Sequence, residues 1–343
     1  MKERIFYNAV NVAENGSYSK ISSLLVKFGS WENAWRKSGA HDGKITNPEI
    51  EWKKIESQGI KLILDSDAEY PPLLKEIPNR PLGIYILGNL PPKSKNCVAV
   101  VGTRKATNEG KRVAKDFSAV LSKSDIVVVS GLALGIDAAA HEGCLEENGE
   151  TIAVLGGGLC NIYPRTNEKL AERILRQNGA IISEYPADSP SLPHQFLQRN
   201  RIISGLSRGV LLVEAPQNSG SLATARFALD QNREIFVVPG PISHPNFIGS
   251  NQLIRSGATL VTKPEEILED LGVETEQKEN PRAYLKTAGE KAVFDALLSH
   301  SEPVGVDKIS EITNLNILEV NRILTFLIIG GMIEETGGNY SLK

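Results

Sequence analysis

The feature that most constrains the fold is a repeat, over residues 98–262, of short apolar segments separated by longer amphipathic ones. The apolar segments are rich in Val and Ile and suit buried strands. The segment 108–124 places Val113, Phe117 and Leu121 on one helical stripe. Strands that alternate with helices predict an α/β fold with a doubly wound, mostly parallel, Rossmann-like sheet. We expect its strands at 98–101, 126–129, 151–155, 180–183, 210–213, 235–238 and 259–261.

The rest of the chain differs from this repeat and predicts further domains. Residues 1–60 carry short apolar stripes and a Gly-Ser break, which are typical of a small helical domain. We assign residues 61–270 to the Rossmann-like domain and the polar, proline-interrupted stretch 271–286 to a linker. Residues 287–343 predict three helices and a Gly-Gly hairpin, the order of a winged-helix domain. The two strands expected before the repeat lie at 61–64 and 84–87.

Charge and composition limit the classes of function. The chain carries 38 Lys+Arg against 41 Asp+Glu, a net charge of −3, so any polyanion site has to be a local cluster. The first 20 residues contain no apolar h-region, so we expect no signal peptide, and no apolar run approaches the ~18 residues of a membrane span. We therefore expect a cytoplasmic protein with no membrane partner. The cysteines, Cys97, Cys144 and Cys160, and the five histidines form no metal-ligand spacing, so no metal is expected.

A ligand is expected beyond the carboxyl ends of the strands, where open α/β sheets bind their ligands. After the first strand of the repeat the chain continues Gly102-Thr103-Arg104-Lys105, where a dinucleotide-binding turn would carry further glycines. This turn presents cations instead of bare backbone. The chain has no P-loop motif, and its Gly-Gly-Gly stretch lacks the last glycine of the dinucleotide fingerprint. No nucleotide cofactor is therefore expected.

A second cationic cluster lies in the stretch "PHQFLQRNRIISGLS". Phe196, Arg199 and Arg201 are expected to stand close together around Asn200, in a segment at the end of the sheet. An aromatic ring with guanidinium groups suits single-stranded nucleic acid, because bases stack on the ring and phosphates pair with the cations. These four residues are therefore candidates for a DNA-binding site.

A different interpretation of the same cluster remains open. Phe196 can be a core residue, and the arginines can pair with Glu184 or Glu214, which follow two of the strands. The cluster alone does not decide between the two. Arg104 and Lys105, at the end of another strand, favour the nucleic-acid interpretation.

The loop "NSGSLATA" offers an anion site that does not depend on cations. It follows a strand and opens a helix, and exposed backbone N–H groups at a helix N-terminus favour anions. Ser219 and Ser221, with Asn218 and Thr224 beside them, can add hydroxyl and amide groups to a phosphate cradle. A simple turn is the alternative for a glycine-rich loop of this kind.

No catalytic constellation is visible, so we expect a protein that is not an enzyme. The pattern "GLSRG" ends a helix and precedes a strand, which is the wrong order for a nucleophile elbow. Asp137 is expected to cap a helix and His141 to hydrogen-bond within the site wall. Glu184 and Glu214 can act as general bases, although anchoring a loop or an arginine is the preferred role. The alternative function is a nucleotide-hydrolysing Rossmann enzyme of the phosphoribohydrolase type.

The chain resembles the DNA-processing protein A family (DprA, also called Smf). The matching motifs follow one another in family order across residues 60–262. They are "VAVVGTRKAT", "SGLALGIDAAAH", "GETIAVLGGGLCNIYP", "SEYP", "RNRIISGLS", "VEA", "SGSLATA" and "VPG". Residues 1–60 resemble the small SAM-like domain of the family, and 287–343 resemble the winged-helix domain that many members carry.

The resemblance implies a non-catalytic homodimer that acts in natural transformation. Such a protein binds and protects incoming single-stranded DNA and helps to load a RecA-type recombinase onto it. The family's G-S/T-R turn falls on Gly102, Thr103 and Arg104, which makes Arg104 the implied phosphate contact. The chain departs from the family pattern at Leu134, in place of arginine, and at Leu197, in place of proline. The missing arginine implies weaker or more salt-sensitive DNA binding.

The C-terminal segment differs in charge from a duplex-binding domain. Residues 284–343 carry five Lys+Arg against eight Asp+Glu, a net charge of −3. The third expected helix offers Arg322 beside Glu319. We therefore expect this domain to contact a protein or to pack within the molecule.

Overall fold

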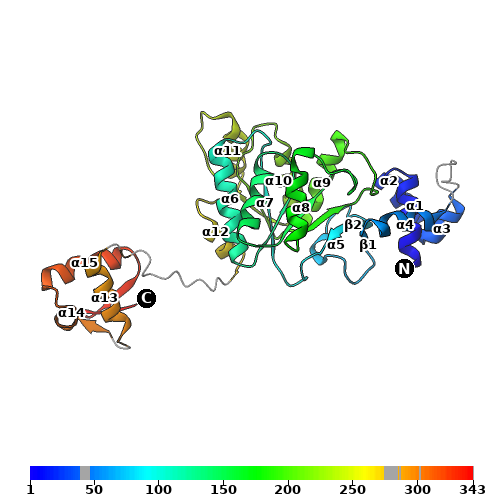
Figure 1. Cartoon of the computed structure of the whole chain (residues 1–343). Coiled ribbons are helices and arrows are strands. Elements are labelled where there is room, and N and C mark those ends of the chain that lie inside the picture. Colours follow the sequence, from blue (N-terminus) through cyan, green and yellow to red (C-terminus); the bar gives the residue numbers. More distant parts are fainter. Residues whose placement is uncertain (39–46, 274–284, 286, 301–302, 343) are drawn as a thin grey trace. The chain divides into compact units, whose positions relative to one another are not determined.

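The computed structural model describes residues 1–38, 47–273, 285, 287–300 and 303–342. The chain divides into two compact units, Met1–Glu274 and Thr275–Lys343. The expected linker, 271–286, lies mostly outside the described residues. Figure 1 shows the elements of both units along the chain.

The larger unit is built on a nine-stranded sheet in the order β1-β2-β6-β5-β4-β3-β7-β8-β9. All the neighbours from β6 to β9 pair in parallel, whereas β1–β2 and β2–β6 pair antiparallel. This confirms the predicted α/β fold with a mostly parallel sheet. The strands are β1 (Lys61–Leu64), β2 (Gly83–Gly88), β3 (Cys97–Val101), β4 (Val127–Ser130), β5 (Thr151–Val154), β6 (Ala180–Ser183), β7 (Gly209–Leu212), β8 (Glu234–Val237) and β9 (Thr259–Leu260).

Helices cover both faces of this sheet. Val98 and Val100 of β3 face one core, which α6, α7 and α12 close, while Ala99 and Val101 face the other, closed by α9 and α10. This alternation follows from the two-residue period of a strand. The helices are α5 (Pro72–Lys75), α6 (Asn108–Lys123), α7 (Ile136–Glu146), α8 (Glu168–Arg176), α9 (Pro193–Gly205), α10 (Gly220–Asp230), α11 (Ile248–Arg255) and α12 (Pro264–Asp270).

The N-terminal helices pack against the antiparallel end of the sheet. Tyr7 and Trp31 share a buried cluster with Tyr85 of β2 and Ile174 of α8. Asn11 donates hydrogen bonds to the hydroxyl of Tyr85 and to the carbonyl of Glu184. The segment 1–60 therefore has a polar as well as an apolar attachment to the sheet. Its helices are α1 (Lys2–Ala13), α2 (Tyr18–Phe28), α3 (Trp31–Lys37) and α4 (Pro48–Ser57).

The smaller unit has a core of its own. Val293, Ile309, Val320 and Leu324 are buried at the centre of three helices and a three-stranded sheet of order β10-β12-β11. No single helix in the described part of the chain is long and apolar enough to cross a membrane, and the bent pair α14–α15 qualifies by length and composition alone. The elements are α13 (Ala288–Leu298), β10 (Val304–Gly305), α14 (Val306–Thr313), α15 (Ile317–Ile329), β11 (Ile333–Thr336) and β12 (Asn339–Leu342).

Candidate functional site

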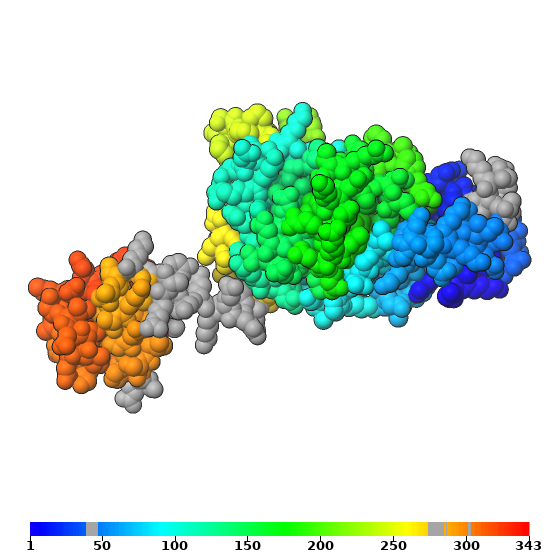
Figure 2. Space-filling view, viewed as in Figure 1, coloured from blue at the N-terminus to red at the C-terminus, as the bar shows by residue number. Residues whose placement is uncertain are grey.

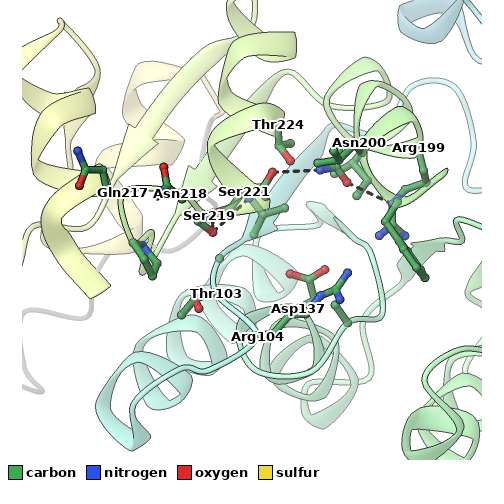
Figure 3. A pocket seen from close by; sticks show the side chains of 18 of the residues that line it. Thr103, Arg104, Asp137, Arg199, Asn200, Gln217, Asn218, Ser219, Ser221 and Thr224 are labelled. Carbon is green, nitrogen blue, oxygen red and sulfur yellow. Dashed lines mark hydrogen bonds between the residues drawn. The ribbon is translucent and has the colours of Figure 1, made fainter. Parts of the chain in front are cut away.

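The sheet reverses its winding between β3 and β7, and a pocket lies at this switch point. The chain runs from β3 through β4 and β5 to β6 on one side, then returns to place β7 on the other side of β3. The loops after β3 and β7 therefore diverge at their carboxyl ends and leave a crevice. A pocket of about 790 Å³ opens there, and Figure 3 shows its lining side chains gathered around one space.

Most of the candidate DNA-binding residues line this pocket. The structure brings together, from three separate stretches of the chain, Gly102, Thr103, Arg104, Phe196, Arg199, Asn200, Ser219 and Ser221. Lys105 and Arg201 are not among the lining residues. Lys105 is exposed next to Arg104, whereas Arg201 is buried on another side of α9.

An aromatic and cationic group forms the mouth of the pocket. The Arg104 guanidinium carbon lies 5.1 Å from the centroid of the Phe196 ring. The ring of Tyr163 lies 5.4 Å from that of Phe196, and Tyr163 is 51% exposed. In the described part of the chain Arg104 has no carboxylate within salt-bridge distance, so its N–H groups remain available to an anion. We call Arg104, Tyr163 and Phe196 the mouth.

Hydrogen bonds and close packing fix the turn that carries Arg104. The Thr103 N–H donates to the Glu214 carbonyl over 2.8 Å, and the Thr103 hydroxyl accepts from the Lys105 N–H. A Cβ at Gly102 would lie 2.5 Å from a side-chain carbon of Ile136, so the close packing of α7 on the turn requires glycine there. Backbone packing therefore directs the Arg104 side chain outward.

Arg199 lies deeper, on the inner wall, and is 4% exposed. Its Nη1 donates to the carbonyls of Gly131 and Val154, and its Nε donates to the Asn200 side chain. Burial lowers the pKa of Arg199 to about 10, against the opposing effect of the Asp137 carboxylate, so the guanidinium is charged at neutral pH. Arg199 therefore contributes positive charge beneath the mouth, while its N–H groups bind the carboxyl ends of β4 and β5.

The N-terminus of α10 forms the opposite wall. Ser219 is the N-cap, and its hydroxyl accepts from the Ser221 N–H over 3.3 Å and lies 2.7 Å from the Ser221 hydroxyl. Asn200 donates to the Gly220 carbonyl, which ties this wall to α9. Ser219 and Ser221 thus lie at a capped helix N-terminus that lines the pocket, a location that favours anions.

Arg201 does not share the surroundings of Arg199, because both lie on helix α9, which spans Pro193–Gly205. Residues two apart on a helix face different sides. Arg201 points toward the N-terminal helices, where its two terminal nitrogens bond the two Glu184 oxygens at 2.7 and 2.6 Å. Burial by itself would lower the pKa of Arg201, but the Glu184 carboxylate outweighs it and raises that pKa. Here the alternative of an arginine paired with Glu184 holds.

The two strand-end glutamates act as anchors in the structure. Glu214 is fully buried and accepts from the backbone N–H and hydroxyl of Thr107, and from the Asn246 side chain over 2.7 Å. Glu184 holds Arg201. Neither glutamate lines the pocket. Both therefore fit the preferred expectation of anchoring a loop or an arginine.

Asp137 and His141 differ from the roles expected for them. Gly135 is the N-cap of α7, and Asp137, one residue inside the helix, accepts from the Gly131 N–H over 3.1 Å. Burial raises the pKa of Asp137, against the opposing effect of Arg199. His141 lies on a buried side of α7, hydrogen-bonded to the Thr151 hydroxyl, and burial lowers its pKa to about 3. The prediction that His141 belongs to the site wall was wrong, since it does not line the pocket.

Sequence reasoning did not single out Tyr163, although it sits within one of the recognised motifs. The tyrosine precedes Pro164 after a glycine-rich loop, and no local pattern shows that this loop folds back onto Phe196. The departures from the family pattern are both at the surface. Leu134 is 46% exposed and lines a small cavity with Arg104 and Phe196, and Leu197 is 50% exposed in the pocket wall. Among the described residues no group of acidic, His or Cys side chains is arranged to hold a metal.

The fold and pocket are those of a Rossmann-like protein with a cationic and aromatic crevice at its switch point, and comparison with known proteins assigns it to a family. Residues 61–272 match the family of DNA recombination-mediator protein A. The chain belongs to this family. It is 41% identical over 285 residues to protein Smf of Escherichia coli, and the aligned region covers 81% of this chain and 76% of Smf. It is 40% identical to DNA processing protein DprA of Bacillus subtilis, over 62% of this chain and 72% of that protein.

Solved structures of two DprA proteins are also similar. DprA from Streptococcus pneumoniae matches with a TM-score of 0.64 and 32% identity, over 77% of this chain and 97% of that one. DprA from Helicobacter pylori, described for its single-stranded DNA binding mode, matches with a TM-score of 0.56 and 30% identity. That match covers 63% of this chain and 97% of the Helicobacter chain. The predicted membership of the DprA/Smf family is confirmed.

Proposed function

We propose that this chain binds single-stranded DNA in the switch-point pocket and performs no chemical step on it. The observation that carries this proposal is the mouth, where the Arg104 guanidinium lies 5.1 Å from the Phe196 ring at the entrance to a pocket of about 790 Å³. A base can stack on an aromatic ring while a neighbouring guanidinium binds the phosphate of the same strand. The Helicobacter relative, described by its single-stranded DNA binding mode, supports the same ligand.

The residues of the pocket divide into contacts and supports in this proposal. Gly102, Thr103 and Arg104 form the turn that meets the phosphates, with Lys105 adding charge beside it. Phe196 and Tyr163 stack bases, and Asn200, Ser219 and Ser221 supply polar groups on the walls. Arg199 supplies buried charge and binds the carboxyl ends of β4 and β5. Arg201 supports α9 through Glu184 and touches no DNA.

The wider role follows from membership of the recombination-mediator family. We infer that the protein acts in the cytoplasm as a homodimer, protects DNA taken up in natural transformation and helps to load a RecA-type recombinase. The SAM-like assignment of residues 1–60 and the winged-helix assignment of 287–343 belong to the same inference. Size-exclusion chromatography with light scattering tests the dimer, and strand-exchange assays with a recombinase and single-strand-binding protein test the loading.

The alternative function, hydrolysis of a nucleotide, has less support. An enzyme of that type needs a carboxylate free to act at the bound nucleotide, and Glu184 and Glu214 are both engaged in hydrogen bonds away from the pocket. Asp137 lines the pocket but is 6% exposed and bonded to a backbone N–H. Incubation with nucleoside monophosphates distinguishes the two functions. Release of free base that Asp137→Asn abolishes would favour the enzyme.

Fluorescence anisotropy with labelled oligothymidine tests DNA binding directly. We expect binding that weakens as salt rises, because each phosphate contact on a single strand contributes about −0.7 to the slope of log K against log salt. Binding with no salt dependence would contradict the phosphate model. A nuclease-free buffer without divalent metal suffices, since no metal is part of the proposal.

Replacing Arg104 gives the sharpest version of this test. We expect Arg104→Ala to weaken binding by ~1–3 kcal/mol, the scale of a charge-assisted hydrogen bond. Arg112→Ala is the matched control, because Arg112 is an exposed arginine on α6 that pairs with Glu109 and does not line the pocket. Equal losses in the two variants would assign the effect to net charge and reject the proposed contact.

A further inference from the structure

The pocket mouth continues onto a basic helix that the proposed function does not use. Tyr163 lines the pocket, Pro164 follows it, and a short turn from Arg165 leads directly into α8. Figures 1 and 2 show α8 on the surface of the larger unit, on the face turned toward the viewer. The first residues after the mouth are therefore the start of an exposed helix.

One side of α8 is cationic. Lys169 and Arg173 are both exposed and lie four residues apart, so they stand one above the other, one helical turn or about 6 Å along the axis. Arg165 is also exposed, in the short turn that precedes α8. Over residues 165–176 the four cations Arg165, Lys169, Arg173 and Arg176 exceed the two acids Glu168 and Glu172 by two, in a chain whose net charge is −3.

Lys169 and Arg173 are not neutralised by the acids around them. Within the described residues the carboxylate pairing found on α8 is Glu172 with Arg176, at 3.1 Å, which leaves Lys169 and Arg173 unpaired. On the neighbouring helix α7, Glu146 and Glu147 are occupied by Lys115 and Lys123 of α6. The positive charges of Lys169 and Arg173 therefore face solvent.

Lys169 and Arg173 repel each other, because like charges four residues apart on a helix are unfavourable. Lys169 is the second residue of α8, and Arg173 lies in its last turn. A polyanion laid along the two cations would relieve this repulsion.

We propose that Lys169 and Arg173 form a second contact surface for single-stranded DNA, which carries the strand away from the pocket along α8. This inference rests on the proposed DNA binding and extends it. A base on Tyr163 and phosphates on the two cations would follow the same strand past the mouth. The protein then contacts more nucleotides than the pocket alone can hold.

We call the surface formed by Lys169 and Arg173 the track. Oligonucleotides of two lengths test DNA binding to the track in the full-length protein. A short oligothymidine of about 5 nucleotides probes the pocket, and one of about 20 nucleotides reaches beyond it, given the ~4–16 nucleotides of typical single-strand sites. We expect Lys169→Gln/Arg173→Gln to leave the short oligomer unaffected and to weaken the long one about tenfold. The salt slope for the long oligomer should fall by about 1.4, which is about 0.7 for each phosphate that the variant no longer binds.

Two further variants make the result decisive. Lys169→Glu/Arg173→Glu should weaken the long oligomer more than the glutamine pair does, and thermal unfolding should show that both variants stay folded. Lys75→Gln/Arg208→Gln is the matched control, because both cations are exposed and Arg208 immediately precedes β7, at the amino ends of the strands opposite the pocket.

The failure of the track and the failure of DNA binding are distinguishable. If the unmodified protein binds neither oligomer, the proposed function fails and the track with it. If it binds both, but the glutamine pair changes neither affinity nor slope, the track is refuted and the pocket stands. Weakening of the short oligomer to the same degree as the long one would also refute it, because the two cations would then belong to the pocket.

Discussion

The mouth of the pocket and the wall behind it use arginine in opposite ways. At the mouth, Arg104 lies against an aromatic ring at the surface, with no carboxylate partner among the described residues. Behind the inner wall, Arg201 is 7% exposed and bound through two hydrogen bonds to Glu184, with the ring of Tyr18 5.5 Å away. One arginine is available to a ligand and the other is part of the framework. The role of each arginine depends on its burial and its interaction partner more than on its residue type.

The largest expected effect comes from breaking the framework pair. We expect Arg201→Ala to lower the free energy of unfolding by about 3–5 kcal/mol, because it leaves the Glu184 carboxylate buried without its partner. Urea denaturation measures the change. The double variant Glu184→Leu/Arg201→Met should recover much of the loss, since it removes both charges. If Arg201→Ala instead reduces DNA affinity with stability unchanged, the two arginines are alike and the comparison fails.

The different roles of Arg199 and Arg201 mark the limit of the sequence prediction. The apolar pattern predicts each strand of the sheet to within a residue at either end, because buried parallel strands have a strong signature. It also predicts which loops meet, since carboxyl ends of parallel strands share an edge. The same reasoning places the arginine segment at the end of the sheet, where both side chains could reach one ligand. In the sequence, Pro193 at the first position of α9 indicates that a helix starts there.

Other features of the site had no local signal. Tyr163 reaches Phe196 only because a glycine-rich loop folds back over the pocket, a contact across more than 30 positions of the chain. Glu214 holds Thr107 and Asn246, which are distant in sequence on either side of it. Such contacts depend on tertiary packing, and a single sequence gives the candidates without their partners. The hydrogen bonds by which Glu184 and Glu214 anchor their partners therefore become visible only in the fold.

A smaller effect is expected from adding a cation to the mouth. Leu134 lines a small cavity together with Arg104, Tyr163 and Phe196. We expect Leu134→Arg to tighten oligothymidine binding by about 1 kcal/mol, the scale of a net hydrogen bond. The salt slope should steepen by about 0.7, as for one added phosphate contact. Anisotropy at two or more salt concentrations measures both.

The control for this gain is a cation added elsewhere on the same unit. Leu229 is 68% exposed on α10 and does not line the pocket, so Leu229→Arg raises the net charge equally without changing the mouth. We expect it to leave affinity close to that of the unmodified chain. A gain as large as that of Leu134→Arg would mean that long-range charge, and not the geometry of the mouth, limits binding.

The smallest effect is expected from removing residues 284–343. The third helix of the smaller unit, α15, exposes Leu318, Phe326 and Ile329 and carries one arginine, Arg322. With a net charge of −3 over 284–343, this surface lacks the cations that phosphate contacts need and offers apolar side chains instead. We therefore expect the truncated chain to bind oligothymidine with nearly unchanged affinity. The larger unit has its own cores, so a circular dichroism melt can verify that it stays folded. A large drop in affinity would place DNA contacts in the smaller unit and contradict the expectation that this unit contacts a protein or packs within the molecule.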